Sequence, residues 1–214
     1  MSTAPGINER AFTVFVVDDD PDVREALGFL LTLRAYRTAL FDSADAFLKV
    51  LRPDSAGCLI TDIRMPGMSG LELQQELANR CHTLPVVVLT AHGSVASARA
   101  ALRALAIDFL AKPFKQDELI ACIETAFERE RQRLARLRTE RLDRALIDGL
   151  TPREREVAAL LATGSQNVDI ARRLNISPRT VEIHKARCLE KLQARTLADL
   201  IRLADRAGLR ADAN

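Results

Sequence analysis

Short apolar runs alternate with helical patterns along the first 127 residues. Residues 13–17 (TVFVV) form a β-branched run that ends in three acids, which is typical of a strand buried on both faces of a parallel sheet. Apolar positions from Val23 to Leu31 follow at helical spacing. Further strands are predicted at 37–41, 58–61, 85–89 and 108–110, and further helices at 43–51, 71–79, 97–104 and from 117 onward. Five strands alternating with five helices predict an α/β doubly wound, five-stranded parallel sheet of the flavodoxin-like type.

A strongly charged segment follows this pattern. Residues 128–144 read ERERQRLARLRTERLDR, with leucine at only three positions. This composition predicts that the last helix continues into a solvated helical linker. Arg141 and Arg144 stand where Leu134 and Leu137 would repeat in a heptad, so a coiled coil is not predicted.

A second domain is predicted to begin near Thr151, which can cap a helix whose first turn holds Pro152 and whose capping-box acid is Glu154. The remaining pattern predicts four helices, at 152–162, 167–174, 178–192 and 197–207. The predicted organisation is a sheet domain at 10–127, a charged helical linker at 128–147, and an all-α four-helix domain at 148–210.

Composition adds a division of charge between the two ends. The 214 residues are 48% hydrophobic and 28% charged, which is typical of a folded globular protein. The net charge of +2 conceals an acidic first part, with 12 Lys/Arg against 16 Asp/Glu in residues 1–127, and a basic surplus in the remainder. This asymmetry favours a polyanionic partner at the C-terminal end.

The four cysteines form no CxxC pair and have no histidine at zinc-site spacing, so reduced and mostly buried thiols are expected. The first twelve residues have no apolar signal-peptide core. No stretch approaches the roughly 20 apolar residues that a membrane span needs. We therefore expect a cytoplasmic protein with no membrane partner.

Carboxylates gather where two predicted strands end. Asp18 and Asp19 follow the first strand, and Asp62 follows the third. Because ligand sites of doubly wound sheets lie beyond the carboxyl ends of the strands, these three acids are predicted to share one pocket. An oxygen-only set with that much negative charge suits Mg²⁺.

Two further side chains complete a predicted phosphoryl-transfer site. Thr90 ends the fourth strand and Lys112 ends the fifth, so a hydroxyl and an ammonium should face the same cleft. A carboxylate can be the nucleophile. The metal and the lysine can neutralise developing charge, and the threonine can donate to the phosphoryl product.

Four motifs carry a resemblance to receiver domains. They are VVDDD (16–20), TDIRMPGMSG (61–70), LTAHG (89–93) and FLAKPF (109–114). The resemblance implies that Asp62 is the phosphoacceptor, that Asp18, Asp19, Asp62 and the Arg64 carbonyl bind Mg²⁺, and that Lys112 precedes a cis proline. It further implies that Thr90 and Phe109 form a switch pair.

The sequence departs from such domains at two positions. Leu105 replaces a frequent glycine before the fifth strand, and Ala96 stands where close relatives often have proline. Both departures concern the expected dimerisation face and leave the acidic pocket unchanged.

The helices at 167–174 and 178–192 are joined by a short turn in which Ser177 can cap the second helix. This helix-turn-helix pattern suits the DNA major groove. Val181, Cys188, Leu189 and Leu192 are expected to face the core. The expected DNA-contacting residues are Arg179, Thr180, Glu182, Ile183, Lys185, Ala186 and Arg187.

The strings LTPREREV (150–157) and IARRLNISPRTVEIHK (170–185) resemble the LuxR-type helix-turn-helix, although Val168 stands where relatives commonly have lysine. With the receiver-like part, the chain is similar to FixJ/NarL-type two-component response regulators, on the FixJ branch. The resemblance implies a sensor histidine kinase and double-stranded promoter DNA as partners, and RNA polymerase as a further one. It also implies a phosphorylation-driven homodimer, formed through Leu197, Leu200 and Ile201.

Such a protein would act on no substrate beyond its own phosphoryl uptake and loss at Asp62. Two other functions use the same features. One is a constitutive DNA binder whose receiver serves only for protein interaction, against which the complete set of pocket residues argues. The other is a phosphohydrolase of small substrates, which gives no reason for the C-terminal domain.

Overall fold

The computed structural model describes residues 12–90 and 108–210. It divides into two compact units, Met1–Arg133 and Leu134–Asn214, which are described separately below. The predicted helix at 97–104 and the departures at Ala96 and Leu105 lie outside the described residues.

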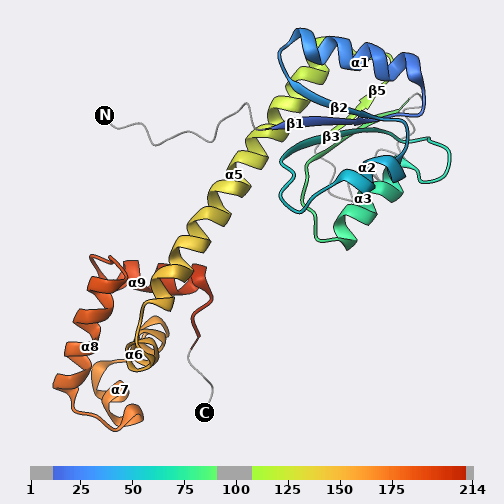
Figure 1. Ribbon diagram of the computed structural model, residues 1–214. Coiled ribbons are helices and arrows are strands. Elements are labelled where there is room, and N and C mark those ends of the chain that lie inside the picture. Colours follow the sequence, from blue (N-terminus) through green and yellow to red (C-terminus); the bar gives the residue numbers. More distant parts are fainter. Residues whose placement is uncertain (1–11, 91–107, 211–214) are drawn as a thin grey trace. The chain divides into compact units, whose positions relative to one another are not determined.

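The first unit contains a parallel five-stranded sheet (Figure 1). Its strand order is β2-β1-β3-β4-β5, and every neighbouring pair is parallel, which confirms the predicted doubly wound sheet. The strands are β1 (Thr13–Val17), β2 (Arg37–Phe41), β3 (Gly57–Asp62), β4 (Val86–Thr90) and β5 (Asp108–Ala111). The order reverses direction between β1 and β3, so the topological switch point lies between these two strands.

Helices α1 (Pro21–Leu33), α2 (Ala44–Val50) and α3 (Gly70–Asn79) begin at side-chain caps. Asp20 accepts from the backbone N–H of Asp22 at 2.9 Å and so serves as the N-cap of α1. Ser69 and Glu72 form a capping box at the start of α3. These caps fix where each helix leaves the edge of the sheet.

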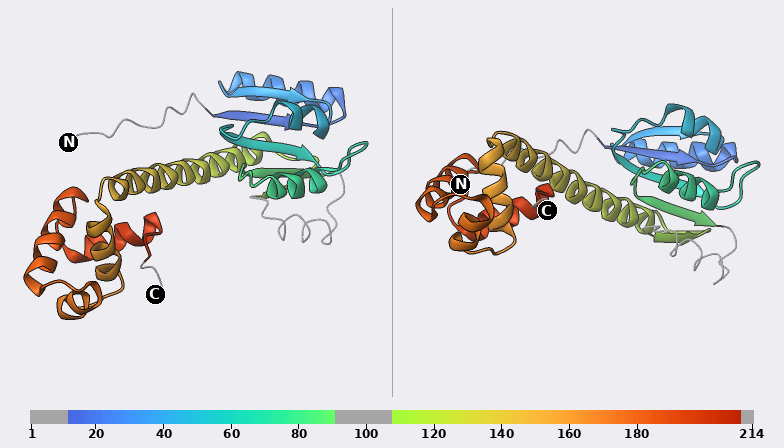
Figure 2. Two further views of the ribbon diagram at one scale, coloured as in Figure 1. Left: turned by 60° about the horizontal axis from the view of Figure 1, so that its bottom comes forward. Right: turned by 90° about the horizontal axis from the view of Figure 1, so that it is seen from below.

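The two faces of the sheet are covered by different helices, because side chains alternate between the faces along each strand. Val17, Leu59 and Val88 pack with Phe47 of α2 and Leu73 of α3 in one buried cluster. Helix α1 lies on the opposite face, as the views in Figures 1 and 2 show. The first turn of α5 (Gln116–Asp148) lies near the end of α1, where Arg34 forms an ion pair with Asp117 at 3.4 Å.

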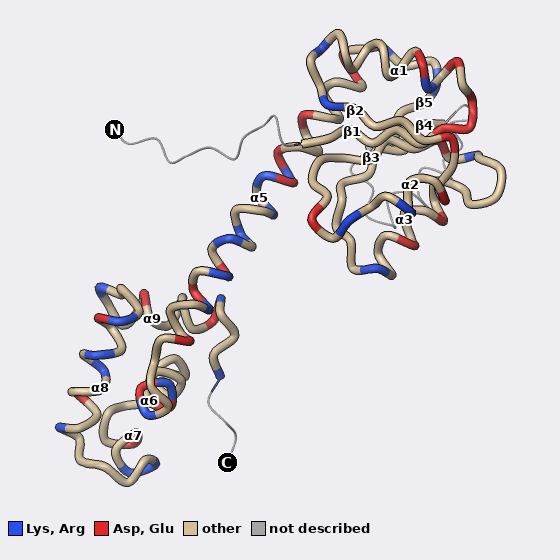
Figure 3. Tube along the Cα trace, viewed as in Figure 1, with Lys and Arg blue, Asp and Glu red and all other residues tan. Residues whose placement is uncertain are grey.

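Helix α5 (Gln116–Asp148) continues without a break through the charged segment, as predicted. Basic and acidic positions alternate along it (Figure 3), and several pair within the helix. Examples are Arg131 with Glu128 at 2.9 Å and Arg136 with Glu140 at 2.8 Å. Helical ion pairs of this kind compensate for a helix that buries few apolar side chains here.

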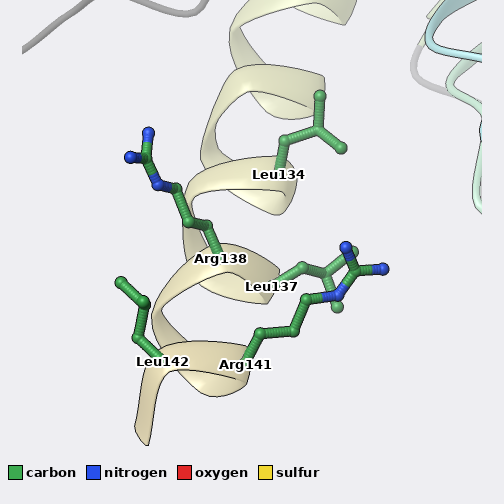
Figure 4. Close-up of a pocket in the computed structure, with 5 residues that line it drawn as sticks. All are labelled: Leu134, Leu137, Arg138, Arg141 and Leu142. Carbon is green, nitrogen blue, oxygen red and sulfur yellow. The ribbon is translucent and has the colours of Figure 1, made fainter. Parts of the chain in front are cut away.

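Figure 4 shows a shallow groove along the later turns of α5, formed by three leucines and two arginines of one helix: Leu134, Leu137, Arg138, Arg141 and Leu142. Leu142 is 58% exposed. The groove therefore belongs to the helix surface and is not a buried cavity.

The second unit is helical and contains α6 (Pro152–Ala162), α7 (Asn167–Leu174), α8 (Pro178–Lys191) and α9 (Leu197–Ala207). The predicted capping box of Thr151 and Glu154 is present. The core combines residues of all four helices with Ile147 in the last turn of α5 and Leu150 just after it. Its members from the four helices include Val157, Leu161, Ile170, Val181, Cys188, Leu200 and Leu203. No helix in the described part of the chain is long and apolar enough to span a membrane.

Candidate functional site

Two carboxylates meet at the switch point of the sheet. Asp18 directly follows β1, and Asp62 is the last residue of the neighbouring β3, whose Thr61 pairs with Val17. The exposed fractions are 1% for Asp18 and 9% for Asp62. Two acids removed from water at one place need a cation or hydrogen-bond donors.

Lys112 supplies that cation. Its Nζ lies 2.9 Å from Asp18 Oδ2 and 2.8 Å from Asp62 Oδ1. The lysine follows β5, its backbone N–H donates to the carbonyl of Thr90 at 2.6 Å, and the predicted cis bond to Pro113 is present. Burial opposes the charge of the ammonium, but the hydrogen bonds to Asp62 and Asp18 outweigh it, so the pKa of Lys112 is raised.

The other oxygen of each carboxylate accepts from the backbone. Asp18 Oδ1 accepts from the N–H of Asp20 at 3.0 Å, and Asp62 Oδ2 accepts from the N–H of Arg64 at 2.7 Å. Every carboxylate oxygen of the pair therefore has a hydrogen-bond donor, which compensates for the burial of the two acids.

Asp19 is placed differently from its neighbour. Its side chain is exposed, and no group of three metal-ligating side chains comes together among residues 12–90 and 108–210. The structure thus brings Asp18, Asp62 and Lys112 together and leaves Asp19 at the rim. The donors still suit Mg²⁺ by type, because Asp18, Asp19, Asp62 and the Arg64 carbonyl all offer oxygen.

Thr90 and Phe109 lie on the same face of the sheet. Phe109 pairs with Val88, two residues before Thr90 on β4, and Thr90 itself pairs with Ala111. Thr90 is buried and Phe109 is half-buried against the cluster that includes α2 and α3. The two positions are therefore diagonal neighbours behind Lys112.

The loop after Asp62 returns tightly to the pocket. A Cβ on Gly70 would lie 2.1 Å from the Asp62 carbonyl oxygen, so no side chain fits at this position. The N–H of Gly70 donates to the carbonyl of Ile63 at 3.1 Å. The glycine thus allows α3 to begin against the end of β3, which fixes the backbone around Asp62.

The second unit contains a helix-turn-helix. Helix α7 is followed by its C-cap Asn175, whose φ of 52° is left-handed. Helix α8 begins after Ser177, whose side chain accepts from the N–H of Thr180 at 3.1 Å. Val181 and Cys188 of α8 are fully buried, so they mark the side of this helix that faces the core. The opposite side of α8 is therefore the side available to a partner.

Most predicted DNA-contacting positions lie on that available side. Ile183 is 47% exposed, and the side chains of Arg179, Glu182, Ala186 and Arg187 are also exposed. Thr180 and Lys185 are half-buried. The hydroxyl of Thr180 is already engaged with that of Ser177 at 2.8 Å.

Two contacts of this unit carry no signal in the sequence pattern. Asn167 Nδ2 at the start of α7 donates to Glu182 Oε1 on α8. Glu154 Oε2 on α6 accepts from Lys191 Nζ at 2.6 Å. Each pair joins residues separated by 15 or 37 positions, so only the packed helices reveal them.

One residue of the predicted dimerisation surface requires a correction. Leu200 is fully buried in the core of its own domain, and a side chain in that position cannot contact a second copy. Leu197 is 36% exposed and Ile201 is half-buried, so both remain accessible on α9. Helical spacing placed the three residues near one another but did not determine which side faces inward.

Two family models match the chain. The response regulator receiver domain matches residues 14–124, and the LuxR family of bacterial regulatory proteins matches residues 148–204.

Relatives match both parts together. The transcriptional regulatory protein FixJ of Bradyrhizobium diazoefficiens is 42% identical, with 92% of this chain and 96% of FixJ covered. FixJ of Azorhizobium caulinodans is 43% identical, with 94% and 95% covered. Among solved structures, the response regulator StyR matches with a TM-score of 0.77 at 41% identity, covering 91% of this chain and 98% of StyR. Full-length FixJ from B. japonicum matches with a TM-score of 0.56 at 41% identity, covering 92% and 97%.

Proposed function

Since this chain belongs to the two-component response regulators that join a receiver domain to a LuxR-type DNA-binding domain, as FixJ does, we propose that phosphorylation of Asp62 controls its binding to promoter DNA. The observation that carries the proposal is the placement of Asp62 beside Asp18 and Lys112 at the switch point. A nucleophilic carboxylate, a second acid and a cation are the groups that an acyl phosphate site requires.

The chemistry is a phosphoryl transfer to the carboxylate. An oxygen of Asp62 forms a bond to phosphorus as the bond between phosphorus and the donor breaks, and the donor group leaves with the bonding electron pair. The donor is a phosphohistidine of the partner sensor kinase or a small acyl phosphate. Lys112 Nζ, already 2.8 Å from Asp62, neutralises negative charge that develops on the phosphoryl oxygens.

We infer that Mg²⁺ binds at the same pocket through Asp18, Asp19, Asp62 and the Arg64 carbonyl. Bound there, the metal supplies positive charge that offsets the charge of the incoming phosphoryl group. Asp19 is exposed at the rim of the pocket, where its carboxylate can bind a Mg²⁺ ion that keeps several of its water ligands. Asp20 is excluded because its carboxylate caps α1.

Thr90 and Phe109 are proposed to carry the signal away from the pocket. The hydroxyl of Thr90 would move toward the phosphoryl group, and the half-buried ring of Phe109 would follow on the same face of the sheet. The outcome would be a homodimer through α9, with Leu197 and Ile201 at the contact.

Promoter DNA is proposed to meet the exposed side of α8. Arg187 and Lys185 would contact phosphates, while Glu182 and Ile183 would contact base edges. Arg179, Thr180 and Ala186 complete the proposed surface. RNA polymerase is proposed as a further partner. We place the protein in the cytoplasm because its DNA partner is there.

The test is labelling of Asp62. Wild type incubated with acetyl phosphate should gain one phosphoryl group on Asp62 in the presence of Mg²⁺ and little in the presence of EDTA, as followed by mass spectrometry of the intact chain and its peptides. Asp62→Asn, which removes the nucleophile but keeps the size of the side chain, should gain none. Labelling of the variant to the wild-type level would contradict the proposal.

A second assay, with phosphate monoesters added in place of acetyl phosphate, separates a phosphohydrolase from a regulator. A hydrolase would consume added phosphate monoesters over many turnovers, whereas the proposed regulator takes up and slowly loses its own phosphoryl group. Rapid turnover of monoesters that depends on Asp62 would favour the enzyme.

A further inference from the structure

One side-chain hydrogen bond ties the exposed side of α8 to the start of α7. Asn167 Nδ2 donates to Glu182 Oε1, and Lys185 Nζ lies 3.9 Å from the same oxygen. Asn167 is half-buried, whereas the side chain of Glu182 is 58% exposed. One carboxylate oxygen of Glu182 is therefore held on the protein, and Oε2 has no protein partner among the described contacts.

A glutamate that enters the major groove faces two difficulties. Its charge is repelled by the DNA phosphates, and its flexible side chain loses rotamer freedom when it binds. The pair of contacts at Oε1 reduces both. Lys185 offsets part of the negative charge, and Asn167 restricts the side chain before DNA arrives.

We propose that Asn167 is a positioning residue for base recognition by Glu182. By holding Oε1, it presents Oε2 to the exocyclic amino group of a base, and the amino group of cytosine is the donor that a carboxylate reads in the major groove. The inference rests on the proposed function, because it requires α8 to enter the groove.

The competing explanation is that the bond only holds α7 and α8 together. The two helices already share a buried core that includes Ile170 and Val181. Loss of a purely structural bond would weaken binding to all DNA sequences alike. Loss of a positioning bond would instead reduce discrimination at one base pair.

The experiment uses the full chain with Mg²⁺ and acetyl phosphate. A duplex that wild type selects from a random pool is compared with variants changed at one base pair each, and the ratio of dissociation constants gives discrimination at every position. Glu182→Ala should lose about tenfold discrimination at one base pair. Asn167→Ala should lose several-fold at that same base pair, and the double variant should lose no more than Glu182→Ala.

Asn167→Asp guards against a folding defect, because an acid is favourable in the first turn of α7 while it repels Glu182. It should reduce discrimination as Asn167→Ala does. Glu156→Gln is the matched control, since it removes an exposed acid paired within α6 to Arg153 at 2.6 Å. This control should discriminate as wild type does.

The proposal is overturned if the Asn167 variants bind matched and mismatched duplexes more weakly by one common factor. It is also overturned if Glu182→Ala keeps wild-type discrimination at every position. Neither result would touch phosphorylation control, which is read from the response of wild type to acetyl phosphate. Failure of wild type to select any sequence would instead contradict the proposed function itself.

Discussion

Lys112 Nζ lies 2.8 Å from Asp62 Oδ1 while it also contacts Asp18 Oδ2. The proposed nucleophile is thus paired with the cation that would later neutralise the phosphoryl group. The same ammonium holds two buried acids together, so Lys112 should affect metal binding and phosphoryl transfer in opposite directions.

Lys112→Ala should strengthen Mg²⁺ binding and slow phosphorylation. Removal of one positive charge from beside two carboxylates makes the pocket more attractive to a cation, by about tenfold in affinity. Loss of the charge that stabilises the transferring group should slow labelling of Asp62 by about a hundredfold. Calorimetric Mg²⁺ titration and rates of acetyl phosphate labelling measure the two effects.

Lys115→Ala is the control, since Lys115 is exposed in the same loop and, in the described part of the chain, its side chain does not contact the acids. It should leave both quantities unchanged. Weaker Mg²⁺ binding by Lys112→Ala would show that the lysine supports the metal site and does not compete with it.

Thr90→Val should separate phosphorylation from its output. Valine keeps the shape of the buried threonine but removes the hydroxyl that is proposed to move toward the phosphoryl group. We expect Asp62 to be labelled, with a rise in DNA affinity at least about fivefold smaller than that of wild type. Thr38→Val on β2, whose hydroxyl bonds the carbonyl of Tyr36 at 3.3 Å, should respond as wild type does. A rise in DNA affinity as large as that of wild type in Thr90→Val would show that the hydroxyl takes no part in the switch.

Glu154→Gln should destabilise the DNA-binding domain in a manner that depends on pH. Hydrogen bonds from Lys191 and the backbone of Thr151 lower the pKa of Glu154 from 4.5 to about 2. Because the folded-state pKa is the lower one, the contribution is present at neutral pH and is lost as the pH falls through 4.5 toward 2. The loss at pH 7 should be about 2 kcal/mol, since a charged hydrogen bond and part of a cap are removed.

Urea unfolding followed through the amide resonances of α8 measures the free energy of unfolding of the DNA-binding domain separately from that of the receiver domain. The difference between wild type and Glu154→Gln should shrink as the pH is lowered and vanish near pH 2. Glu156→Gln, at an exposed ion pair of the same helix, should change stability by less than about 0.5 kcal/mol at any pH. A difference for Glu154→Gln that stays constant with pH would assign the effect to packing.

Neighbouring residues of α9 should behave in two distinct ways. Leu200→Ala removes a fully buried side chain and should cost about 2–5 kcal/mol of stability. Leu197→Glu changes a partly exposed position, so it should leave folding intact while it prevents the phosphorylated protein from dimerising. Sedimentation velocity and thermal unfolding distinguish these outcomes. A stable dimer of phosphorylated Leu197→Glu would exclude this part of α9 from the interface.

The fold could be predicted because its signals are local. The run 13–17 ends in acids, Thr151 and Glu154 form a capping box, and Asn175 precedes a capped helix. Such features depend on residues within a few positions of one another. The convergence of Asp62 and Lys112 was also predictable, since strand ends of a parallel sheet share one edge.

The remaining details depend on packing between distant segments. Helical spacing does not reveal that Leu200 faces the core while Leu197 is partly exposed. The bond between Asn167 and Glu182 requires the angle at which α7 and α8 meet. Asp19 follows the same strand as Asp18, yet the chain turns it toward solvent at the start of α1.

The most direct test of the account compares wild type with Asp62→Ala, each with Mg²⁺ and with or without acetyl phosphate, by DNA affinity and sedimentation on a duplex selected by wild type. We expect acetyl phosphate to make wild type dimerise and bind at least about tenfold more tightly, and we expect no response from Asp62→Ala. Equal binding by both proteins under every condition would contradict this expectation and would favour a constitutive DNA binder.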